Sequence, residues 1–225
     1  MNNSDMISRK ISGGWDQPQV VVLKNNDLPA GEIAVLKELL SPGERAKSER
    51  FRLPHDRDSY TIVHGLLRRI LGEYFNISPD RVEIGYDAFG KPFVSGNPGK
   101  MFFNLSHSAG ISALAFDRDH EIGVDVEQVR KDFEYRPIVE RFFAREDKQF
   151  LLSSEENGAT GFFKVWTRKE ALLKAIGAGI GEDLAISVSG PVSSGFLLNT
   201  MMFGEQYVIT VATNPVSGGI RTIIN

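Results

Sequence analysis

Hydrophobic positions change their period along the chain, and each period predicts a different element. Residues 20–23 form an apolar run between polar connectors, which is typical of a buried strand. Within Asp58–Leu71, apolar residues recur every three or four positions and predict a core helix. Shorter helices are predicted over 33–40 and from Pro42, with Ser41 as the N-cap and proline at the first helical position.

Short apolar or alternating runs in the rest of the chain predict strands. These runs cover residues 82–86, 93–94, 101–105, 111–116, 122–126, 186–188 and 207–212. Glycine and proline within 87–92 predict a turn, and Ser106–Gly110 is predicted to be a hairpin loop. Helical and strand segments follow each other in blocks, so the pattern predicts an α+β fold.

Two sequence echoes indicate an internal duplication. Arg50-Phe51 returns as Arg141-Phe142, each before a charged helical stretch, and residues 65–70 are echoed by 171–176. The second pair is about fifteen residues further apart than the first, so the later copy is expected to hold an insertion. The polar segment Ser153–Gly161 is the candidate for it.

Length and composition fit this duplication. A chain of 225 residues with 41% hydrophobic content can bury one substantial core or two small ones. We predict two similar halves, residues 1–117 and 118–225, related by a pseudo-twofold axis. A cleft between two such halves is a common place for a ligand.

Charge and cysteine content exclude several classes of function. The net charge of −3 and the pI near 5.9 argue against a general nucleic-acid-binding protein. The absence of cysteine excludes disulfides, thiolate nucleophiles and thiolate zinc sites, so a metal would need oxygen or histidine ligands. A secretion signal and a long apolar span are both missing, which predicts a cytoplasmic protein without a membrane segment.

One segment departs from the acidic average. Between residues 41 and 69, seven bases outnumber four acids, which could suit a compact anion such as a nucleotide phosphate. A solvated amphipathic helix with mixed charges explains the same composition equally well. The bases are Arg45, Lys47, Arg50, Arg52, Arg57, Arg68 and Arg69.

Two acidic motifs about forty residues apart carry the strongest chemical signal. Asp125 and Glu127 alternate with apolar residues, so a strand would place both carboxylates on one face. Glu170 and Lys174 lie one helical turn apart and are predicted to be neighbours. Carboxylates are the ligands that Mg²⁺ prefers, and a nearby ammonium could hold a phosphate. The motifs therefore indicate phosphoryl-type chemistry.

Each acidic motif also has an ordinary structural explanation. An Asp-x-Glu pair on a strand is often a solvated strand face, and a Glu/Lys pair at this spacing is often surface decoration of a helix. Both explanations remain open from the residues alone.

Three motifs in this order resemble the signatures of the 4′-phosphopantetheinyl transferases. They are Phe103-Asn104-Leu105-Ser106-His107-Ser108, Gly123-Val124-Asp125-Val126-Glu127 and Trp166-x-x-Lys169-Glu170-Ala171-x-x-Lys174. The duplicated length is similar to the Sfp-type branch rather than to the short trimeric holo-acyl-carrier-protein synthases. The resemblance covers about residues 41 to 188 and implies a pseudo-dimeric α+β fold in a monomeric protein.

The resemblance also implies a reaction. The phosphopantetheine arm of coenzyme A would pass to a serine of an apo acyl or peptidyl carrier protein, with release of 3′,5′-ADP. Asp125, Glu127 and Glu170 would hold Mg²⁺, for which Mn²⁺ could substitute. Lys174 would contact the pyrophosphate, and Glu170 is the candidate for the base that removes the serine proton.

Further contacts to coenzyme A are implied in the same way. Ser106, His107 and Asp125 would touch its phosphates and adenosine, and Gly90-Lys91-Pro92 would border the adenine. Lys47 would reach the 3′-phosphate, with help from Arg45 or Arg57. Relatives often carry a lysine at the position of Glu44, so this part of the pattern differs here.

Two other functions remain as alternatives. One is a different Mg²⁺-dependent phosphotransferase or nucleotide hydrolase, although the chain lacks the common Gly-x-x-x-x-Gly-Lys-[Ser/Thr] phosphate loop. The other is a carrier-binding module without activity, which the retained carboxylates and Lys174 disfavour. A carrier is expected to dock on residues 141–144 and 153–161, with at least one of Phe142 and Phe143 in the core instead. The sequence leaves the carrier and its pathway open.

Overall fold

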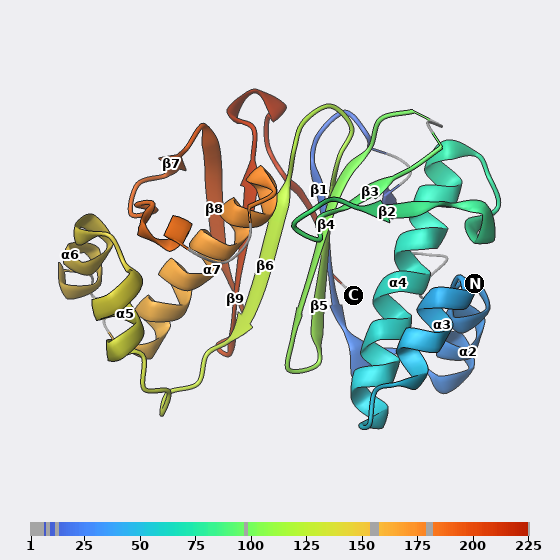
Figure 1. Cartoon of the computed structure of the whole chain (residues 1–225), viewed down its shortest axis with the longest axis horizontal. Coiled ribbons are helices and arrows are strands. Elements are labelled where there is room, and N and C mark those ends of the chain that lie inside the picture. The colour runs from blue at the N-terminus through green and yellow to red at the C-terminus, as the bar shows by residue number, and fades with distance from the viewer. Residues whose placement is uncertain are drawn as a thin grey trace.

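The computed structural model describes residues 7, 10–11, 14–96, 99–153, 158–178 and 182–224. Figure 1 shows two sheets that stand next to each other at the centre of the molecule, with helices on both outer sides. One sheet has the strand order β10-β1-β5-β4, and the other has the order β6-β9-β8-β7. The predicted α+β fold with two similar halves is confirmed, since each half has a long helix packed against a four-stranded sheet.

The first half packs its longest helix against the sheet, and its two shorter helices pack against that long helix. The elements are β1 (Gln19–Lys24), α2 (Ala30–Glu38), α3 (Pro42–Glu49), α4 (Pro54–Phe75), β2 (Ile84–Tyr86), β3 (Pro92–Val94), β4 (Phe102–Ser108) and β5 (Ile111–Asp117). Single 3₁₀ turns lie at Asn25–Asp27 and Pro79–Arg81. Ser41 caps α3 as predicted, and the apolar stripe of α4 is buried. Helix α4 is longer than predicted because Pro54 starts it and the left-handed Asn76 ends it.

The second half repeats this plan with α7 as its long helix. The elements are β6 (Gly123–Gln128), α5 (Arg136–Phe142), α6 (Arg145–Ser153), α7 (Ala159–Ile176), β7 (Val192–Ser193), β8 (Phe196–Phe203) and β9 (Tyr207–Thr213), with 3₁₀ turns at Glu182–Ala185 and Pro215–Ser217. The predicted insertion 153–161 runs from the last residue of α6 into the first turn of α7, and its residues 154–157 lie outside the described part of the chain.

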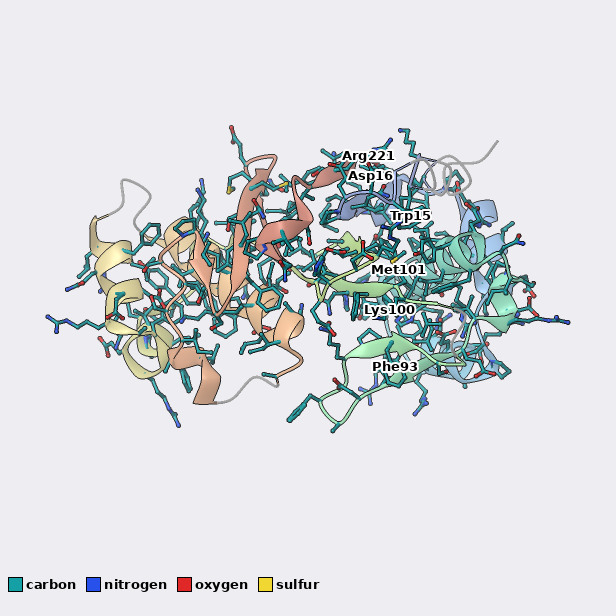
Figure 2. The ribbon with its side chains drawn as sticks, turned by 90° about the horizontal axis from the view of Figure 1, so that it is seen from above. Trp15, Asp16, Phe93, Lys100, Met101 and Arg221 are labelled. Atoms are coloured by element: carbon teal, nitrogen blue, oxygen red, sulfur yellow. The ribbon has the colours of Figure 1, made fainter. Side chains whose placement is uncertain are left out.

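The last strand, β10 (Arg221–Ile224), returns to the sheet of the first half. It pairs in parallel with β1, where Gln19 lies opposite Arg221. Figure 2 shows Arg221 close to Trp15 and Asp16, which precede β1. The chain therefore crosses between the halves a second time, and the division into residues 1–117 and 118–225 stays a prediction.

Two predicted elements are wrong. Residues 106–108, predicted as part of a loop, continue strand β4, and the hairpin turn is only Ala109-Gly110, both with positive φ. Residues 186–188, predicted as a strand, form no ladder. Side chains bond their backbone instead: the Val188 N–H donates to Asp147 Oδ1 at 2.9 Å, and Lys169 Nζ donates to the Ile186 carbonyl at 2.6 Å.

Candidate active site

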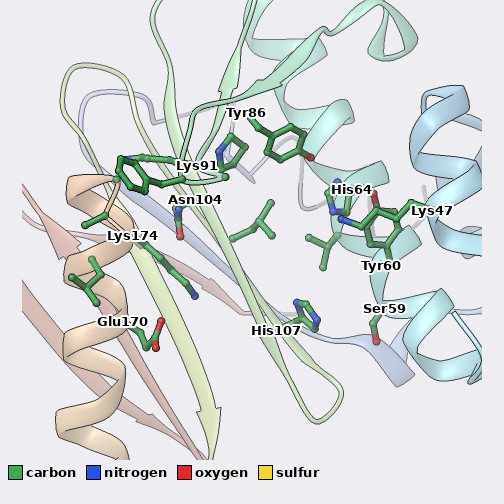
Figure 3. Close-up of a pocket in the computed structure, with 18 of the residues that line it drawn as sticks. Lys47, Ser59, Tyr60, His64, Tyr86, Lys91, Asn104, His107, Glu170 and Lys174 are labelled. Carbon is green, nitrogen blue, oxygen red and sulfur yellow. The ribbon is translucent and has the colours of Figure 1, made fainter. Parts of the chain in front are cut away.

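A cavity of about 520 Å³ lies between the two halves. Figure 3 shows Lys47, Tyr60 and His64 on one side of it and Glu170 and Lys174 of helix α7 on the other. The hairpin of β2 and β3 and strand β4 also contribute to its wall. Seven of the predicted site residues line it: Lys47, Gly90, Lys91, Pro92, His107, Glu170 and Lys174. The predicted cleft between the halves is therefore present.

Close packing at Gly123 sets the position of helix α7 on strand β6. A Cβ atom added at Gly123 would lie 2.0 Å from the carbonyl oxygen of Ala171 and 2.6 Å from the backbone nitrogen of Ala175. Only glycine permits this approach of helix to strand. The contact brings Glu170 and Lys174 against the strand that carries Asp125.

Asp125 and Lys174 form the centre of the site. Lys174 Nζ lies 2.7 Å from Asp125 Oδ1, and it also donates to Ser106 Oγ at 3.1 Å and the Val124 carbonyl at 3.3 Å. Ser106 Oγ donates to the same Asp125 oxygen at 2.8 Å. Ser106 and Asp125 are both buried behind the cavity wall, so they reach the cavity through Lys174 rather than by lining it.

The three carboxylates repel each other. Burial raises the pKa of Glu170 to about 7, and the negative charges of Asp125 and Glu127 add to this while Lys174 opposes it. Burial likewise raises the pKa of Glu127, helped by Asp125, although a hydrogen bond from Ser108 opposes the shift. The site thus holds a surplus of negative charge that a bound cation would relieve.

The side chains as they stand do not form a finished metal site. Within the described ranges, no three histidine or acidic side chains are clustered closely enough to hold an ion. Asp125 Oδ2 is nevertheless buried and lacks a hydrogen-bond partner, whereas Oδ1 of the same residue is bonded. A buried carboxylate oxygen without a partner is costly, so this atom fits a ligand that the protein itself does not supply.

The opposite wall carries basic and aromatic side chains. Lys47 Nζ lies 5.3 Å from the ring centroid of Tyr60, and Tyr60 stacks on His64 with 4.0 Å between the centroids. His107 also faces the cavity, where burial and the charge of Lys174 lower its pKa. Tyr60 and His64 were not predicted as site residues, because a lone aromatic and a lone histidine on a core helix resemble ordinary packing.

Two other bases of the cationic segment bond backbone carbonyl groups. Arg45 bonds the carbonyls of Glu38 and Leu40, and Arg57 bonds that of Phe51. Neither arginine lines the cavity, so the expected help for Lys47 from Arg45 or Arg57 is not seen. Of the seven bases of this segment, only Lys47 lines the cavity.

Glu44, like Arg45 and Arg57, makes contacts within the fold and does not line the cavity. It closes a capping box with Ser41, and Arg68 Nε lies 2.5 Å from its Oε2. Burial would raise the pKa of Glu44, but the nearby His64, 3.5 Å away, and the hydrogen bonds from Ser41 and Arg68 outweigh it and lower the pKa to about 2. The residue thus faces inward rather than toward a phosphate.

A lowered pKa at Glu44 predicts a loss of stability in acid. A carboxyl with a folded pKa near 2 and an ordinary unfolded value stabilises the fold above pH 4.5, and this contribution disappears as the pH falls toward 2. We expect Glu44→Gln to lower the free energy of unfolding at pH 7 by about 2–3 kcal/mol, and by less as the pH falls through this range. Urea unfolding of both proteins at several pH values measures this difference in the free energy of unfolding.

Glu49→Gln is the control, because the ion pair of Glu49 with Lys37 is exposed and is expected to contribute less than about 1 kcal/mol. Equal stability losses in the two variants at pH 7 would contradict the assignment.

Lys91 connects the β2–β3 hairpin to helix α7. Its Nζ donates to the carbonyl of Ala175 at 2.5 Å and forms an ion pair with Glu121. A cation at the C-terminal end of a helix is favourable, because the last carbonyls are unpaired there. The Lys91 ammonium group therefore links the two halves. Its neighbours Gly90 and Pro92 border the cavity.

Comparisons with known proteins agree with this architecture. Residues 121–213 match the family model of the 4′-phosphopantetheinyl transferase superfamily, and residues 29–118 match that of the 4′-phosphopantetheinyl transferase N-terminal region. The 4′-phosphopantetheinyl transferase HetI of a Nostoc species is 34% identical over 168 residues, which are 72% of this chain and 71% of HetI.

Two bacterial relatives are similar at the same level. The 4′-phosphopantetheinyl transferase psf-1 of Bacillus pumilus is 35% identical over 68% of this chain and 65% of its own length. The 4′-phosphopantetheinyl transferase gsp of Aneurinibacillus migulanus is 31% identical over 65% of this chain and 61% of its own length.

The two-halved fold, the cavity between the halves and these matches define a transferase. The chain belongs to the 4′-phosphopantetheinyl transferase superfamily. The resemblance drawn from the three motifs, with relatives of the Sfp type, is thereby confirmed. None of the described helices is long and apolar enough to cross a membrane.

Proposed function

We propose that the cavity binds coenzyme A and that the protein transfers its phosphopantetheine arm to a serine of an apo acyl or peptidyl carrier protein. The observation that carries this proposal is the juxtaposition of Lys174 with Asp125 and Glu170 at one end of the cavity, opposite Lys47. One end could thus hold a pyrophosphate, and the other could hold a separate phosphate.

The transfer requires one bond to form and one to break. The serine oxygen bonds to the phosphorus next to the pantetheine arm, the pyrophosphate P–O bond breaks, and its electron pair leaves with 3′,5′-ADP. The serine proton goes to Glu170, a carboxylate that lines the cavity next to Lys174 and is therefore within reach of a serine placed there. Lys174 stabilises the charge on the pyrophosphate oxygens.

Magnesium fits the acidic end of the site. Asp125, Glu127 and Glu170 are the proposed ligands, supported by the unpartnered Asp125 Oδ2 and by the raised pKa values of the two glutamates. A bound Mg²⁺, or Mn²⁺ in its place, would neutralise the phosphate oxygens of coenzyme A. We also propose that the protein is a monomer and acts in the cytoplasm.

Recognition of the 3′-phosphate is proposed for Lys47. We expect Lys47→Glu to raise KM for coenzyme A at least about tenfold but to change KM for 3′-dephospho-coenzyme A much less, since only the first carries the additional phosphate. Steady-state kinetics with both substrates measure this. Lys37→Glu is the control, because Lys37 is an exposed lysine that pairs with Glu49 away from the cavity. Equal effects of Lys47→Glu on both substrates would contradict the assignment.

Docking of the carrier is proposed to involve Phe142 with Arg141. Phe142 is 36% exposed, and the Arg141 guanidinium lies 5.0 Å from its ring centroid, so the pair offers an apolar contact with a basic rim. Phe143 is only 4% exposed and stacks on Phe162, which makes it the core residue expected among the two.

We therefore expect substitution of Phe142 to change the carrier KM and substitution of Phe143 to change stability. Phe142→Ala is expected to raise KM for the carrier severalfold at an unchanged melting temperature, because rim contacts contribute to association. Phe143→Ala is expected to lower the free energy of unfolding by about 3 kcal/mol or more. Carrier titrations and thermal melts measure both. A carrier KM that Phe142→Ala leaves unchanged would exclude this docking surface.

The proposed function is tested by incubation with coenzyme A, Mg²⁺ and a panel of apo carrier proteins of fatty-acid, polyketide and nonribosomal-peptide synthesis. Mass spectrometry should show a gain of one phosphopantetheine arm on at least one carrier. No gain on any carrier would contradict the proposal.

A further inference from the structure

Strands β4 and β6 meet at the boundary between the halves. β4 is the edge strand of one sheet and β6 is the edge strand of the other, and Figure 1 shows them side by side at the centre of the molecule. No backbone ladder joins them in the part of the chain that the structure describes. The outward N–H groups of β6 therefore need other acceptors, because unpaired backbone groups are costly when buried.

Side chains of β4 provide these acceptors at regular intervals. Asn104 Oδ1 accepts from the Val124 N–H at 3.2 Å, and Ser106 Oγ accepts from the Val126 N–H at 3.3 Å. Ser108 Oγ accepts from the Gln128 N–H at 3.2 Å. The offset is 20 residues in all three pairs, so the strands run parallel in a fixed register.

The two serines also reach the carboxylates of β6. Ser106 Oγ donates to Asp125 Oδ1 at 2.8 Å, and Ser108 Oγ donates to Glu127 Oε2 at 2.9 Å. Each serine hydroxyl thus donates to the carboxylate of one β6 residue and accepts from the backbone N–H of the next β6 residue. This repeated unit fixes both the strand register and the orientation of the carboxylates.

We infer that Asn104, Ser106 and Ser108 form a polar zipper that sets the register between the halves, and that Ser108 is a positioning residue for Glu127. The inference about Glu127 rests on the proposed metal-dependent transfer. Ser108 is the informative member, because Ser106 also bonds Lys174 and Asn104 lines the cavity. The Ser108 hydroxyl is outside the cavity wall and acts through Glu127.

The hydrogen bond from Ser108 restricts the orientation of Glu127, a proposed metal ligand. A carboxylate held in one orientation loses less freedom when it binds an ion, and loss of such a partner typically lowers metal affinity 10–100-fold. The bonds from Ser108 are also part of the inter-half register, so the zipper couples the fit of the two halves to the geometry of the carboxylates.

The test is Ser108→Ala, with Mn²⁺ binding followed by electron paramagnetic resonance of free Mn²⁺. The protein is loaded with coenzyme A and no carrier is added, so no turnover occurs, and coenzyme A alone gives the blank. We expect the Kd for Mn²⁺ to rise about tenfold. Ser108→Thr retains a hydroxyl and is expected to restore an affinity close to that of the wild type.

Ser217→Ala is the matched control. Ser217 Oγ donates to Asp117 Oδ2 at 2.9 Å, a serine–carboxylate contact of the same length away from the cavity. This variant is expected to keep the wild-type Kd for Mn²⁺, even where its melting temperature falls as much as that of Ser108→Ala. A merely structural role of Ser108 would make the two variants equal in both measurements.

The outcomes separate the two proposals. A wild type that transfers the arm and binds Mn²⁺, with an unchanged Kd in Ser108→Ala, overturns the role of Ser108 and leaves the proposed function intact. A wild type that neither binds Mn²⁺ nor transfers the arm overturns both. A raised Kd in Ser108→Ala that Ser108→Thr reverses supports the positioning role.

Discussion

Asp125→Asn is expected to lower kcat/KM for phosphopantetheine transfer by about 10³-fold or more, while the melting temperature changes little. Asp125 is the carboxylate that Lys174 and Ser106 orient, and its free oxygen is the proposed first ligand of the metal. Loss of one preorganised charge at a phosphoryl-transfer site typically costs two to three orders of magnitude or more in rate.

The fold should tolerate this change because the amide keeps the shape of the side chain. The Lys174 side chain is 29% exposed and can turn toward the cavity when its partner loses charge. Asp119→Asn is the control, since Asp119 is an exposed carboxylate paired with Arg118. Kinetics at saturating Mg²⁺ and a thermal melt measure both variants, and near-normal transfer by Asp125→Asn would remove the residue from the active site.

Gly123→Ala is expected to reduce both stability and activity. Its Cβ would fall 2.0 Å from a backbone oxygen of α7, so helix and strand must separate at a cost of about 3 kcal/mol or more. The separation would carry Glu170 and Lys174 away from Asp125, which should lower kcat/KM in the fraction that remains folded. Urea unfolding and active-site kinetics measure the two effects.

Gly43→Ala is the matched control for this substitution. A Cβ at Gly43 meets nothing within 4 Å, and the residue lies in helix α3, where alanine is favoured over glycine. This variant is expected to be neutral or slightly more stable. If Gly123→Ala were equally well tolerated, close packing could not be what places α7.

Elements with a strong local signal were predictable from the sequence. Ser41 and Pro42 mark the start of α3, and the apolar stripe marks α4, because both signals depend only on neighbouring residues. The sequence predicts too short a strand β4, because the polar residues 106 and 108 resemble a loop. Their acceptors and donors lie on β6, so the reason for these polar positions is a long-range contact.

Other elements depend on contacts that no local pattern contains. β10 was not predicted, and its four residues form a strand through parallel pairing with β1 at the other end of the chain. Residues 186–188 have strand-like composition, but the buried pair of Lys169 with Asp147 holds their backbone in an irregular path. Tertiary contacts thus override local preference in both directions.

The candidate site was predictable where its residues occur in motifs. Glu170, Lys174 and His107 line the cavity, while Asp125 and Ser106 lie directly behind Lys174. The aromatic wall was missed because Tyr60 and His64 come from a core helix without a motif. The role of Lys91 between the halves was also missed, since its partner Ala175 is far away in the sequence.

Release of 3′,5′-ADP tests the central claim most directly. The protein is incubated with coenzyme A and Mg²⁺, with and without an apo carrier protein, and 3′,5′-ADP is quantified by chromatography beside the mass of the carrier. We predict release only with the carrier, in equal amount to the phosphopantetheine gained by one of its serines. Release of 3′,5′-ADP without a carrier, or without a gain in carrier mass, would identify a hydrolase and contradict the account.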